Sequence, residues 1–391
     1  MRTEQDPSCA ARRHPAGVQR RDHDRRCPKD RPRGAAPLAA IVGGTAQHVI
    51  ENRWKNRDMR IPKQFAALLA LTLLNSACDA SQAVDAKKSV VATNGKSEDY
   101  AGVWQQPTGS VQMNIWPGPA PDGTFRPQPP ESVDVYDDAG SAGGKSEVVL
   151  DISVPTMTVM PAKGANTGTA IIVFPGGGFR KVFVGLEGTE VCDWLVAKGI
   201  TCIVSKYRAP GGNDFWDPDL ERQVTPKIPR ALQDAQRTIR LVRSKATELG
   251  INPSRIGVLG MSAGGYLVAQ TSNILKPTYR PVDAIDKISS RPDFAIALYP
   301  GHICRDDGSF DPTLPVTKVA PPTFIVQAWN DETDAICNSL MYATALNKAG
   351  VSTEVHLFAE GGHAFAMRHP QEPVGKWPEL VELWLKQIKM L

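Results

Sequence analysis

The sequence lacks the features that would indicate a membrane-embedded, nucleotide-binding or zinc-binding protein. It contains no uninterrupted run of 18 apolar residues, so no ordinary membrane-spanning helix is predicted. It has no GxxxxGK followed by Ser or Thr, and its seven cysteines include no CxxC pair or zinc-ligand spacing. We therefore expect no metal ion and no other cofactor.

Basic charge is scarce outside the first part of the chain. Residues 1–58 hold 13 Lys/Arg and 7 Asp/Glu, whereas the remaining 333 residues hold 32 Lys/Arg and 34 Asp/Glu. The net charge of +4 therefore comes from the front segment. The rest of the chain lacks the basic surplus that nucleic-acid binding requires, and we expect no nucleic-acid partner.

The first 100 residues divide into three segments that precede the predicted fold. Residues 1–58 are rich in Arg and Pro, which fits either a disordered extension ahead of a later start codon or a basic interaction arm. Residues 59–78 have the pattern of an export signal, because Arg60 and Lys63 precede a ten-residue apolar stretch at 65–74. Residues 79–100 are polar and are predicted to form a flexible linker.

Cys78 follows small residues at the end of this signal. The pattern resembles the signal of a bacterial lipoprotein, in which that cysteine is lipidated, and ordinary cleavage after Ala80 or Ala83 is the alternative. Both predict an exported protein, located in the periplasm, anchored in the outer membrane or released outside the cell. A lipid on Cys78 would be the one expected contact with a membrane.

From residue 101 onward, short apolar runs alternate with helical patterns. The runs at 169–174, 255–259 and 323–327 are almost continuously apolar, which is typical of parallel strands that are covered on both faces. Helices are predicted between such runs, at 187–198, 229–249, 263–274, 334–348 and 376–390. This alternation predicts one α/β domain over residues 101–391 with a mostly parallel, doubly wound sheet. The polar and aromatic insertion at 209–228 is a candidate lid or substrate loop.

The stretch Gly260-Met261-Ser262-Ala263-Gly264 is a GxSxG motif between a predicted strand and a predicted helix. In such a strand–turn–helix, a sharp turn exposes the serine, and small flanking residues let the two elements approach each other. The pattern predicts that Ser262 is a nucleophile. An ordinary glycine-rich turn is the alternative.

A serine nucleophile needs a base, and the base needs an orienting acid. His363 lies in a glycine-containing loop after the last predicted strand and is the preferred base, with His302 as the alternative. Asp331 follows the predicted strand at 323–327 and is the preferred acid. Glu332 is a further option for the acid, and Asp334 is read as either the acid or the N-cap of the next helix.

Three consecutive glycines follow the predicted strand at 169–174, and such a loop can turn its backbone amides toward a substrate. The predicted oxyanion hole consists of the N–H groups of Gly177, Gly178 and Ala263. Glu187 is expected to hydrogen-bond this loop. Asp234 and Arg237, three residues apart on a predicted helix, are expected to form a structural ion pair.

Residues 113–391 resemble the α/β-hydrolase superfamily, and within it the bacterial exported acetyl xylan esterases and xylanase-associated esterases. The matching stretches are 114–118, 174–179, 187–188, 206–208, 234–237, 260–266 and 361–365. The resemblance implies the α/β-hydrolase fold, a serine esterase activity and the triad Ser262, Asp331 and His363. Pro175, Asn330 and Ala364 depart from relatives, which carry His, Asp and Gly at those places.

The resemblance implies a small acyl ester as the substrate, with an acetyl ester on xylan or another plant carbohydrate fragment as the first choice. A short-chain carboxylesterase acting on non-sugar esters, a serine peptidase of the same fold and a binding module without catalysis are the alternatives. Trp329, Trp216 and Phe179 are predicted substrate contacts, with ordinary packing as the alternative for the tryptophans.

Two cysteine pairs receive different predictions. Cys304 and Cys337 follow strands that are expected to be neighbours, so we predict a disulfide between them, against two free thiols. Cys192 and Cys202 fall in a helix and a strand pattern and are expected to be buried apolar side chains.

Overall fold

The computed structural model describes residues 104–123, 129–137, 140–209, 216–217, 222–223, 229–305 and 307–391. The segments 1–58, 59–78 and 79–100, Cys78 included, lie outside these residues, as does most of the insertion at 209–228. None of the helices in the described ranges is both long enough and apolar enough to cross a lipid bilayer.

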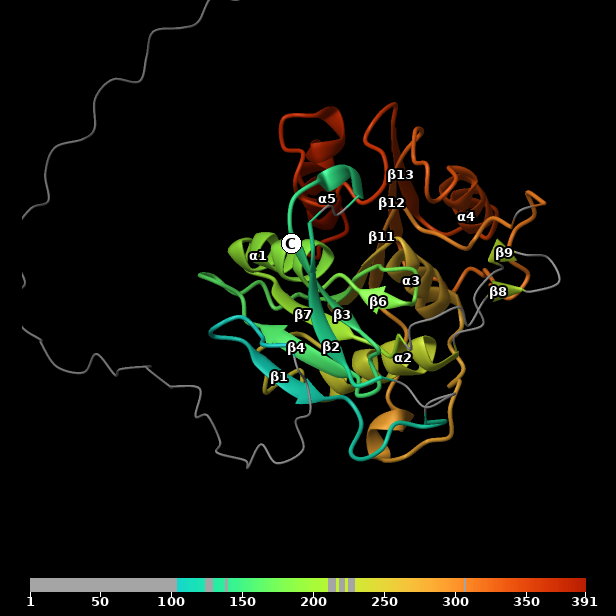
Figure 1. Ribbon diagram of the computed structural model, residues 1–391. Coiled ribbons are helices and arrows are strands. Elements are labelled where there is room, and N and C mark those ends of the chain that lie inside the picture. Colours follow the sequence, from blue (N-terminus) through green and yellow to red (C-terminus); the bar gives the residue numbers. More distant parts are fainter. Residues whose placement is uncertain are drawn as a thin grey trace, which may run out of the picture. The chain divides into compact units, whose positions relative to one another are not determined.

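The largest sheet has eight strands within the described residues. In chain order they are Val111–Asn114 (β1), Thr156–Met160 (β4), Ala170–Phe174 (β5), Thr201–Lys206 (β7), Ile256–Met261 (β10), Phe294–Leu298 (β11), Thr323–Ala328 (β12) and Thr353–Phe358 (β13). Their order across the sheet is β1-β4-β7-β5-β10-β11-β12-β13 (Figure 1). The pairs β1–β4 and β4–β7 are antiparallel, and every later neighbour is parallel. The predicted mostly parallel sheet is confirmed.

Five α-helices are present in the described part of the chain: Glu190–Ala197 (α1), Pro229–Ser244 (α2), Ala263–Asn273 (α3), Cys337–Lys348 (α4) and Trp377–Gln387 (α5). They cover both faces of the sheet, because alternate residues of one strand join different cores. Ile172 and Phe174 of β5 pack in a cluster with residues of α2, α3 and α4. Ile171 and Val173 pack with residues of α1 and α5. This explains the continuous apolar runs, since a strand covered on both faces has no polar side.

The described residues also form several smaller strands and helical turns. A three-stranded antiparallel sheet is formed by Ser132–Tyr136 (β2), Ser146–Leu150 (β3) and Lys181–Val182 (β6), and a short hairpin by Trp216–Asp217 (β8) and Arg222–Gln223 (β9). Helical turns lie at Gly140–Ala142, Gly185–Thr189, Ala284–Lys287 and Pro373–Lys376. The predicted helix at 187–198 therefore begins as the π-helical turn Gly185–Thr189 and continues as α1.

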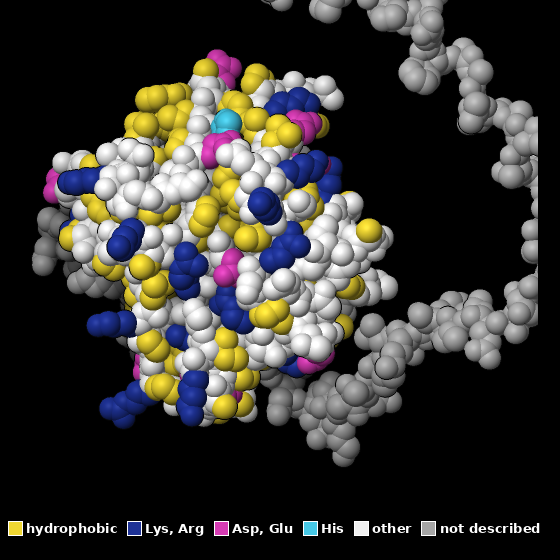
Figure 2. Space-filling view, turned by 180° about the vertical axis from the view of Figure 1, so that it is seen from behind, with side chains coloured by type: hydrophobic (Ala, Val, Ile, Leu, Met, Phe, Trp, Pro, Cys, Tyr) yellow, Lys and Arg dark blue, Asp and Glu magenta, His cyan; other side chains and the backbone are white. Residues whose placement is uncertain are grey.

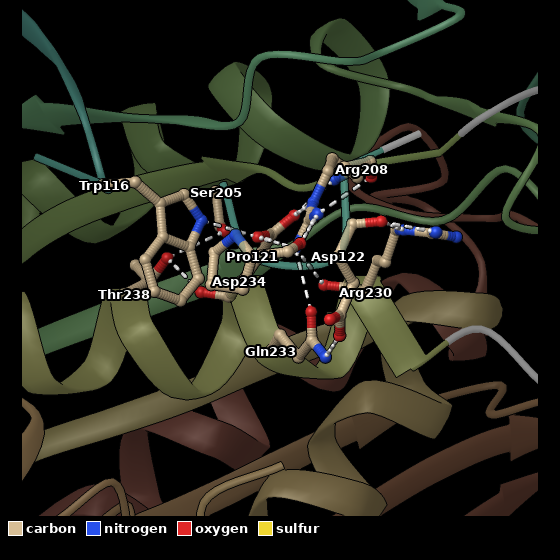
Figure 3. Close-up of polar contacts among 10 residues, drawn as sticks. Trp116, Pro121, Asp122, Ser205, Arg208, Arg230, Gln233, Asp234 and Thr238 are labelled. Carbon is tan, nitrogen blue, oxygen red and sulfur yellow. Dashed lines mark hydrogen bonds and ion pairs between the residues drawn. The ribbon is translucent and has the colours of Figure 1, made fainter. Parts of the chain in front are cut away.

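The predicted ion pair between Asp234 and Arg237 is wrong. The Asp234 carboxylate pairs with Arg208 at 2.9 Å and accepts from Trp116 Nε1 at 2.8 Å (Figure 3). Arg237 pairs instead with Asp283 and Asp286. The physical reason is that α2 buries 13 of its 16 residues, so partners come from the segments packed around the helix and not from its own surface.

Polar side chains of α2 and Arg208 fasten the early segment around residues 115–123 to the domain (Figure 3). Arg208 Nη1 donates to Pro121 O at 2.6 Å, Arg230 Nη2 donates to Asp122 O at 2.7 Å, and Gln233 Nε2 donates to Asp122 Oδ2 at 2.6 Å. Buried charges need such partners because an unpaired charge in the interior is strongly destabilising. This network accounts for the polar character of a helix that lies inside the protein.

Figure 2 shows one face of the molecule, on which Lys and Arg side chains are dispersed among apolar and uncharged groups. They do not gather into a continuous basic surface on that face. This agrees with the balance of charge in the sequence after residue 58.

Candidate active site

Ser262 lies in a sharp turn between β10 and α3. Its φ of 53° and ψ of −122° form a conformation that residues other than glycine rarely adopt. Backbone hydrogen bonds hold the turn, since Ser262 N–H donates to Leu298 O at 3.1 Å and Ser262 O accepts from Gly301 N–H at 3.2 Å. A Cβ on Gly264 would lie 1.8 Å from Phe174 O, so glycine is required for α3 to begin this close to β5.

A chain of hydrogen bonds links the three residues predicted as a triad. His363 Nε2 lies 3.1 Å from Ser262 Oγ, and His363 Nδ1 lies 3.0 Å from both carboxylate oxygens of Asp331. Asp331 also accepts from Thr333 N–H at 3.0 Å and from Gln327 Nε2 at 3.2 Å. The carboxylate is thereby held so that it faces Nδ1, which leaves Nε2 directed at the serine. A base in this position can take the serine proton.

The imidazole of His363 is supported from two further sides. Asn330 Oδ1 accepts from Gly362 N–H at 2.8 Å and so fixes the loop that carries the histidine. The Tyr299 ring meets the imidazole edge-on with centroids 5.0 Å apart. Burial by itself lowers the pKa of His363, but its hydrogen bond to Asp331 and the charges of Asp334, Asp331 and Glu187 outweigh burial and raise it.

The predicted oxyanion loop follows β5 and is fixed from behind by Glu187 and Tyr207. Glu187 Oε2 accepts from Gly176 N–H at 2.6 Å, which confirms the expected contact, and Tyr207 OH donates to Pro175 O at 2.5 Å. The N–H groups of Gly177 and Gly178 donate to no acceptor among the residues that the structure describes. Ala263 is the first residue of α3, where N–H groups have no partner inside the helix. Binding of an oxyanion by these three amides stays a prediction.

Glu187 is enclosed in the protein beneath this loop. Its other oxygen, Oε1, accepts from Tyr299 OH at 2.9 Å, so one carboxylate joins the oxyanion loop to the tyrosine that contacts His363. Burial is the main cause that raises the pKa of Glu187, against the lowering effects of His363, Gly176 and Tyr299.

A second carboxylate, that of Asp334, faces the nucleophile. Asp334 Oδ2 accepts from Ser262 Oγ at 3.3 Å and lies 3.8 Å from His363 Nε2. The predicted N-cap role is wrong, because α4 begins at Cys337 and its N-cap is Ile336. The predicted helix start at residue 334 fails for the same reason, since the backbone of Asp334 is turned toward Asp331 and Gln327.

Comparisons with known proteins identify the superfamily of this chain. The profile of the prolyl oligopeptidase family matches residues 231–389, and the profile described as BD-FAE matches residues 159–280. A crystal structure of an acetyl ester-xyloside bifunctional hydrolase from Caldicellulosiruptor lactoaceticus is 32% identical, with a TM-score of 0.52, and the match covers 61% of this chain and 89% of that one. This chain belongs to the α/β-hydrolase superfamily. It resembles the acetyl xylan esterases within it.

Two further relatives of this α/β hydrolase are informative. The acetylxylan esterase of Xylanibacter ruminicola is 28% identical over 223 residues, which are 51% of this chain and 41% of that protein. The chain thus matches less than half the length of that curated relative. Esterase 2 of Thermogutta terrifontis is 23% identical with a TM-score of 0.52, covering 68% of this chain and 97% of that one, and supports the fold.

Two disulfides are present among the described residues of the hydrolase. The predicted pair, Cys304 and Cys337, is joined, with Cα atoms 5.7 Å apart. Cys192 and Cys202 are joined as well, with Cα atoms 5.3 Å apart, so their predicted role as free apolar side chains is wrong. The reason is that α1 packs directly on β7, which brings a helix residue and a strand residue face to face.

The predicted substrate contacts have different surroundings. Phe179 is only 2% exposed and packs against Tyr207, Tyr266 and His302, so it belongs to the core beneath the oxyanion loop and the predicted contact is wrong. Trp329 is 54% exposed and is available to a ligand. Trp216 lies in β8, and its side chain is outside the described residues.

The alternative base, His302, packs against the aromatic rings of Phe179 and Tyr266. Burial lowers the pKa of His302 to about 4. Asp334 is the residue next to Ser262 that the sequence pattern placed wrongly. Its spacing of three residues from Asp331, directly after a buried strand, is the signal that could have indicated a second carboxylate at this edge of the sheet.

Proposed function

We propose that this α/β hydrolase is a serine carboxylic ester hydrolase. The observation that supports this most directly is the chain of hydrogen bonds from Ser262 through His363 to Asp331, at the edge of the sheet where the parallel strands end. The order Ser, Asp, His along the chain is the one that α/β hydrolases use.

Acylation begins with Ser262 Oγ attacking the acyl carbon of the ester. His363 Nε2 takes the serine proton and then gives it to the departing alcohol. Asp331 stabilises the imidazolium formed between these two transfers, because its oxygens lie 3.0 Å from Nδ1. The same histidine then activates water, which releases the acid and restores Ser262.

The oxyanion formed in each half-reaction is assigned to the amides of Gly177, Gly178 and Ala263. Each such donor typically contributes about 3–4 kcal/mol of transition-state stabilisation. Glu187 keeps Gly176 turned away from the substrate by accepting its N–H, so the next two amides remain free. This arrangement takes the place of the histidine that related lipases carry at the position of Pro175.

The proposed substrate is a small acyl ester, with an acetyl group on xylan or another plant carbohydrate fragment as the leading choice. The names of the similar acetylxylan esterase and acetyl ester-xyloside hydrolase support it. Exposed Trp329, two residues before Asp331, offers an aromatic face that a sugar ring could pack on. A simple ester such as an aryl acetate is the alternative, supported by the similar arylesterase of Saccharolobus solfataricus.

Two measurements test this function. Incubation with an organophosphonate is expected to label Ser262, as found by peptide mass spectrometry, and to abolish activity in proportion to labelling.

Acetate release is then compared between acetylated xylan, acetylated xylo-oligosaccharides and 4-nitrophenyl acetate. Cleavage of a peptide substrate without ester hydrolysis would favour the peptidase alternative, which the match to the prolyl oligopeptidase family keeps relevant.

Activity is expected to fall at acidic pH, with the midpoint above the ordinary imidazole pKa of 6.5. His363 must be neutral to accept a proton, and the surrounding carboxylates raise its pKa, so the inactive protonated form persists to higher pH than for a free imidazole. The measurement is kcat/KM for an aryl acetate from about pH 5 to about pH 9, where the free enzyme titrates. A midpoint below that of free imidazole would contradict the assignment of the base.

Export is proposed from the signal pattern at residues 59–78, with lipid attachment at Cys78 as its finer form. The disulfides Cys192–Cys202 and Cys304–Cys337 support export, because disulfides persist in oxidising compartments and are rare in the cytosol. Fractionation of cells that express the full chain, followed by mass spectrometry of the mature N-terminus, distinguishes lipidation at Cys78 from cleavage after Ala80 or Ala83.

A further inference from the structure

Asp334 stands in a position that the triad mechanism leaves unexplained. Its backbone N–H donates to Asp331 Oδ1 at 2.9 Å, and its carbonyl accepts from Gln327 Nε2 at 2.6 Å. The residue is therefore fixed to the loop that carries the triad acid. Its side chain, 14% exposed, is directed at Ser262 and at the Nε2 edge of His363.

The neighbouring segment leaves space for this carboxylate. Gly301 follows β11, and a Cβ added to it would lie 2.6 Å and 2.7 Å from the two oxygens of Asp334. A glycine at this place is needed for the acid to reach the serine. Gly301 N–H also donates to Ser262 O. The same residue therefore holds the turn at Ser262 and leaves space for the Asp334 carboxylate.

The charge environment of Asp334 is set by its acidic neighbours and by His363. Within the described residues Asp334 forms no ion pair with Lys or Arg, and its one ion-pair partner is His363. The titratable groups that act on it are His363, Asp331 and Glu187, and Ser262 donates the hydrogen bond. Burial is the largest cause that raises the pKa of Asp334, to about 6, so the carboxylate is mostly ionised at neutral pH.

Ser262 has a single O–H, which lies within reach of both His363 Nε2 and Asp334 Oδ2, and this donor is lost when the proposed acyl-enzyme forms. Oγ then carries the acyl group and has no proton, so Asp334 becomes an acceptor without this donor. At the same stage a water must enter beside His363 Nε2 to attack the acyl carbon. That water has two O–H groups, and the histidine can accept only one of them.

The spacing of the two acceptors suits one bridging water. Asp334 Oδ2 and His363 Nε2 are 3.8 Å apart, and a water oxygen about 2.8 Å from each can donate one hydrogen to each. Oδ2 is also 3.3 Å from Oγ, so the bridged water lies next to the atom that bears the acyl group.

We propose that Asp334 is a further catalytic residue, which accepts the second hydrogen bond of the water that hydrolyses the acyl-enzyme. The inference rests on the proposed ester hydrolase function. In this step the water oxygen bonds to the acyl carbon, one water proton passes to His363 Nε2, and the carbonyl electron pair moves onto the oxyanion. The other hydrogen stays covalently bound to the former water oxygen and is hydrogen-bonded to Asp334. Collapse breaks the bond from carbon to Oγ, and Oγ takes the proton from Nε2.

Methanol as a competing nucleophile tests the hydrogen bond between the attacking water and Asp334. Methanol has a single O–H, which goes to His363, so it has no hydrogen for Asp334 and gains nothing from that residue. Acyl-enzyme formed from 4-nitrophenyl acetate in aqueous methanol partitions between acetate and methyl acetate. The product ratio compares the two nucleophiles on one intermediate, and it does not depend on how much of the protein is folded.

The variant Asp334→Leu removes the acceptor while filling its space. We expect the ratio of methyl acetate to acetate to rise about tenfold or more over wild type, the usual effect of losing a hydrogen bond to a charged group. Asp334→Asn keeps the size and a weaker acceptor, so a smaller rise is expected. In stopped-flow experiments both variants should release the first equivalent of nitrophenolate at near the wild-type rate and then turn over slowly.

Glu332→Gln is the matched control, because Glu332 is an exposed acid of the same loop. It should leave the product ratio at the wild-type value. An unchanged ratio in both Asp334 variants, or equal slowing of the first and later turnovers, would overturn the role of Asp334. Inactivity of wild type and of Glu332→Gln toward aryl acetate would instead refute the proposed function itself, so the two failures are distinguishable.

Discussion

Replacing Ser262 by alanine is expected to lower kcat for 4-nitrophenyl acetate by about a millionfold, the scale found when a serine hydrolase loses its nucleophile. The covalent route then disappears, and His363 has no serine proton to take. Activity that remains would come from binding and from the oxyanion amides acting on attack by water. The rate is measured at a pH where His363 is neutral, and trace contamination is excluded with the phosphonate.

Ser254→Ala is a suitable control for this experiment, since Ser254 is an exposed serine in the turn before β10. It should retain wild-type activity. Circular dichroism and thermal unfolding of both variants establish that the domain is folded. Because alanine at position 262 must adopt the same φ of 53°, we expect little change in stability. Retention of more than about one hundredth of the wild-type kcat would contradict the role of Ser262 as nucleophile.

Replacing Asp331 by asparagine is expected to lower kcat by about ten-thousandfold. Both oxygens of Asp331 lie 3.0 Å from His363 Nδ1, so the carboxylate fixes the tautomer that carries its proton on Nδ1. An amide NH₂ in that place would donate to Nδ1 and move the ring proton to Nε2, where it blocks acceptance of the serine proton. The measurement is kcat across the same pH range as for wild type.

Asp334→Asn provides the comparison, because the two acids lie on opposite edges of the same imidazole. Asp334 faces Nε2 at 3.8 Å and does not contact Nδ1. Its replacement is expected to cost far less than that of Asp331 and to shift the acidic limb of the pH profile downward, since one of the charges that raise the pKa of His363 is removed. A larger loss in Asp334→Asn than in Asp331→Asn would exchange the roles assigned to the two acids.

Local sequence patterns were sufficient to predict most of the strands and helices of the domain. The apolar run at 169–174 became β5 with a boundary shifted by one residue, and the run at 323–327 became β12, which is longer by one residue. GxSxG and the glycine loop are continuous motifs whose function depends on backbone shape, and that shape follows from glycine at set places. His363 and Asp331 could be proposed because parallel strands present the residues after their carboxyl ends at one edge.

The wrong predictions concern residues whose partners are set by the packing of one element on another. Asp234 and Arg237 are near neighbours on α2, but enclosure of that helix gave each a partner elsewhere. Cys192 and Cys202 are only ten residues apart, yet their pairing depended on how α1 lies against β7. Helix spacing alone could not indicate either outcome, because it says which residues share a face and not what that face meets.

The amino-acid sequence by itself determined the alternation of strands and helices, the nucleophile turn and the identity of the groups available for acyl transfer. These depend on short-range properties, namely apolar periodicity, glycine positions and side-chain chemistry. Only the tertiary structure decided that Asp334 turns away from α4 toward Ser262 and that Glu187 also accepts a hydrogen bond from Tyr299. Both contacts join segments tens of residues apart in the chain, and their approach is set by the packing of the whole domain.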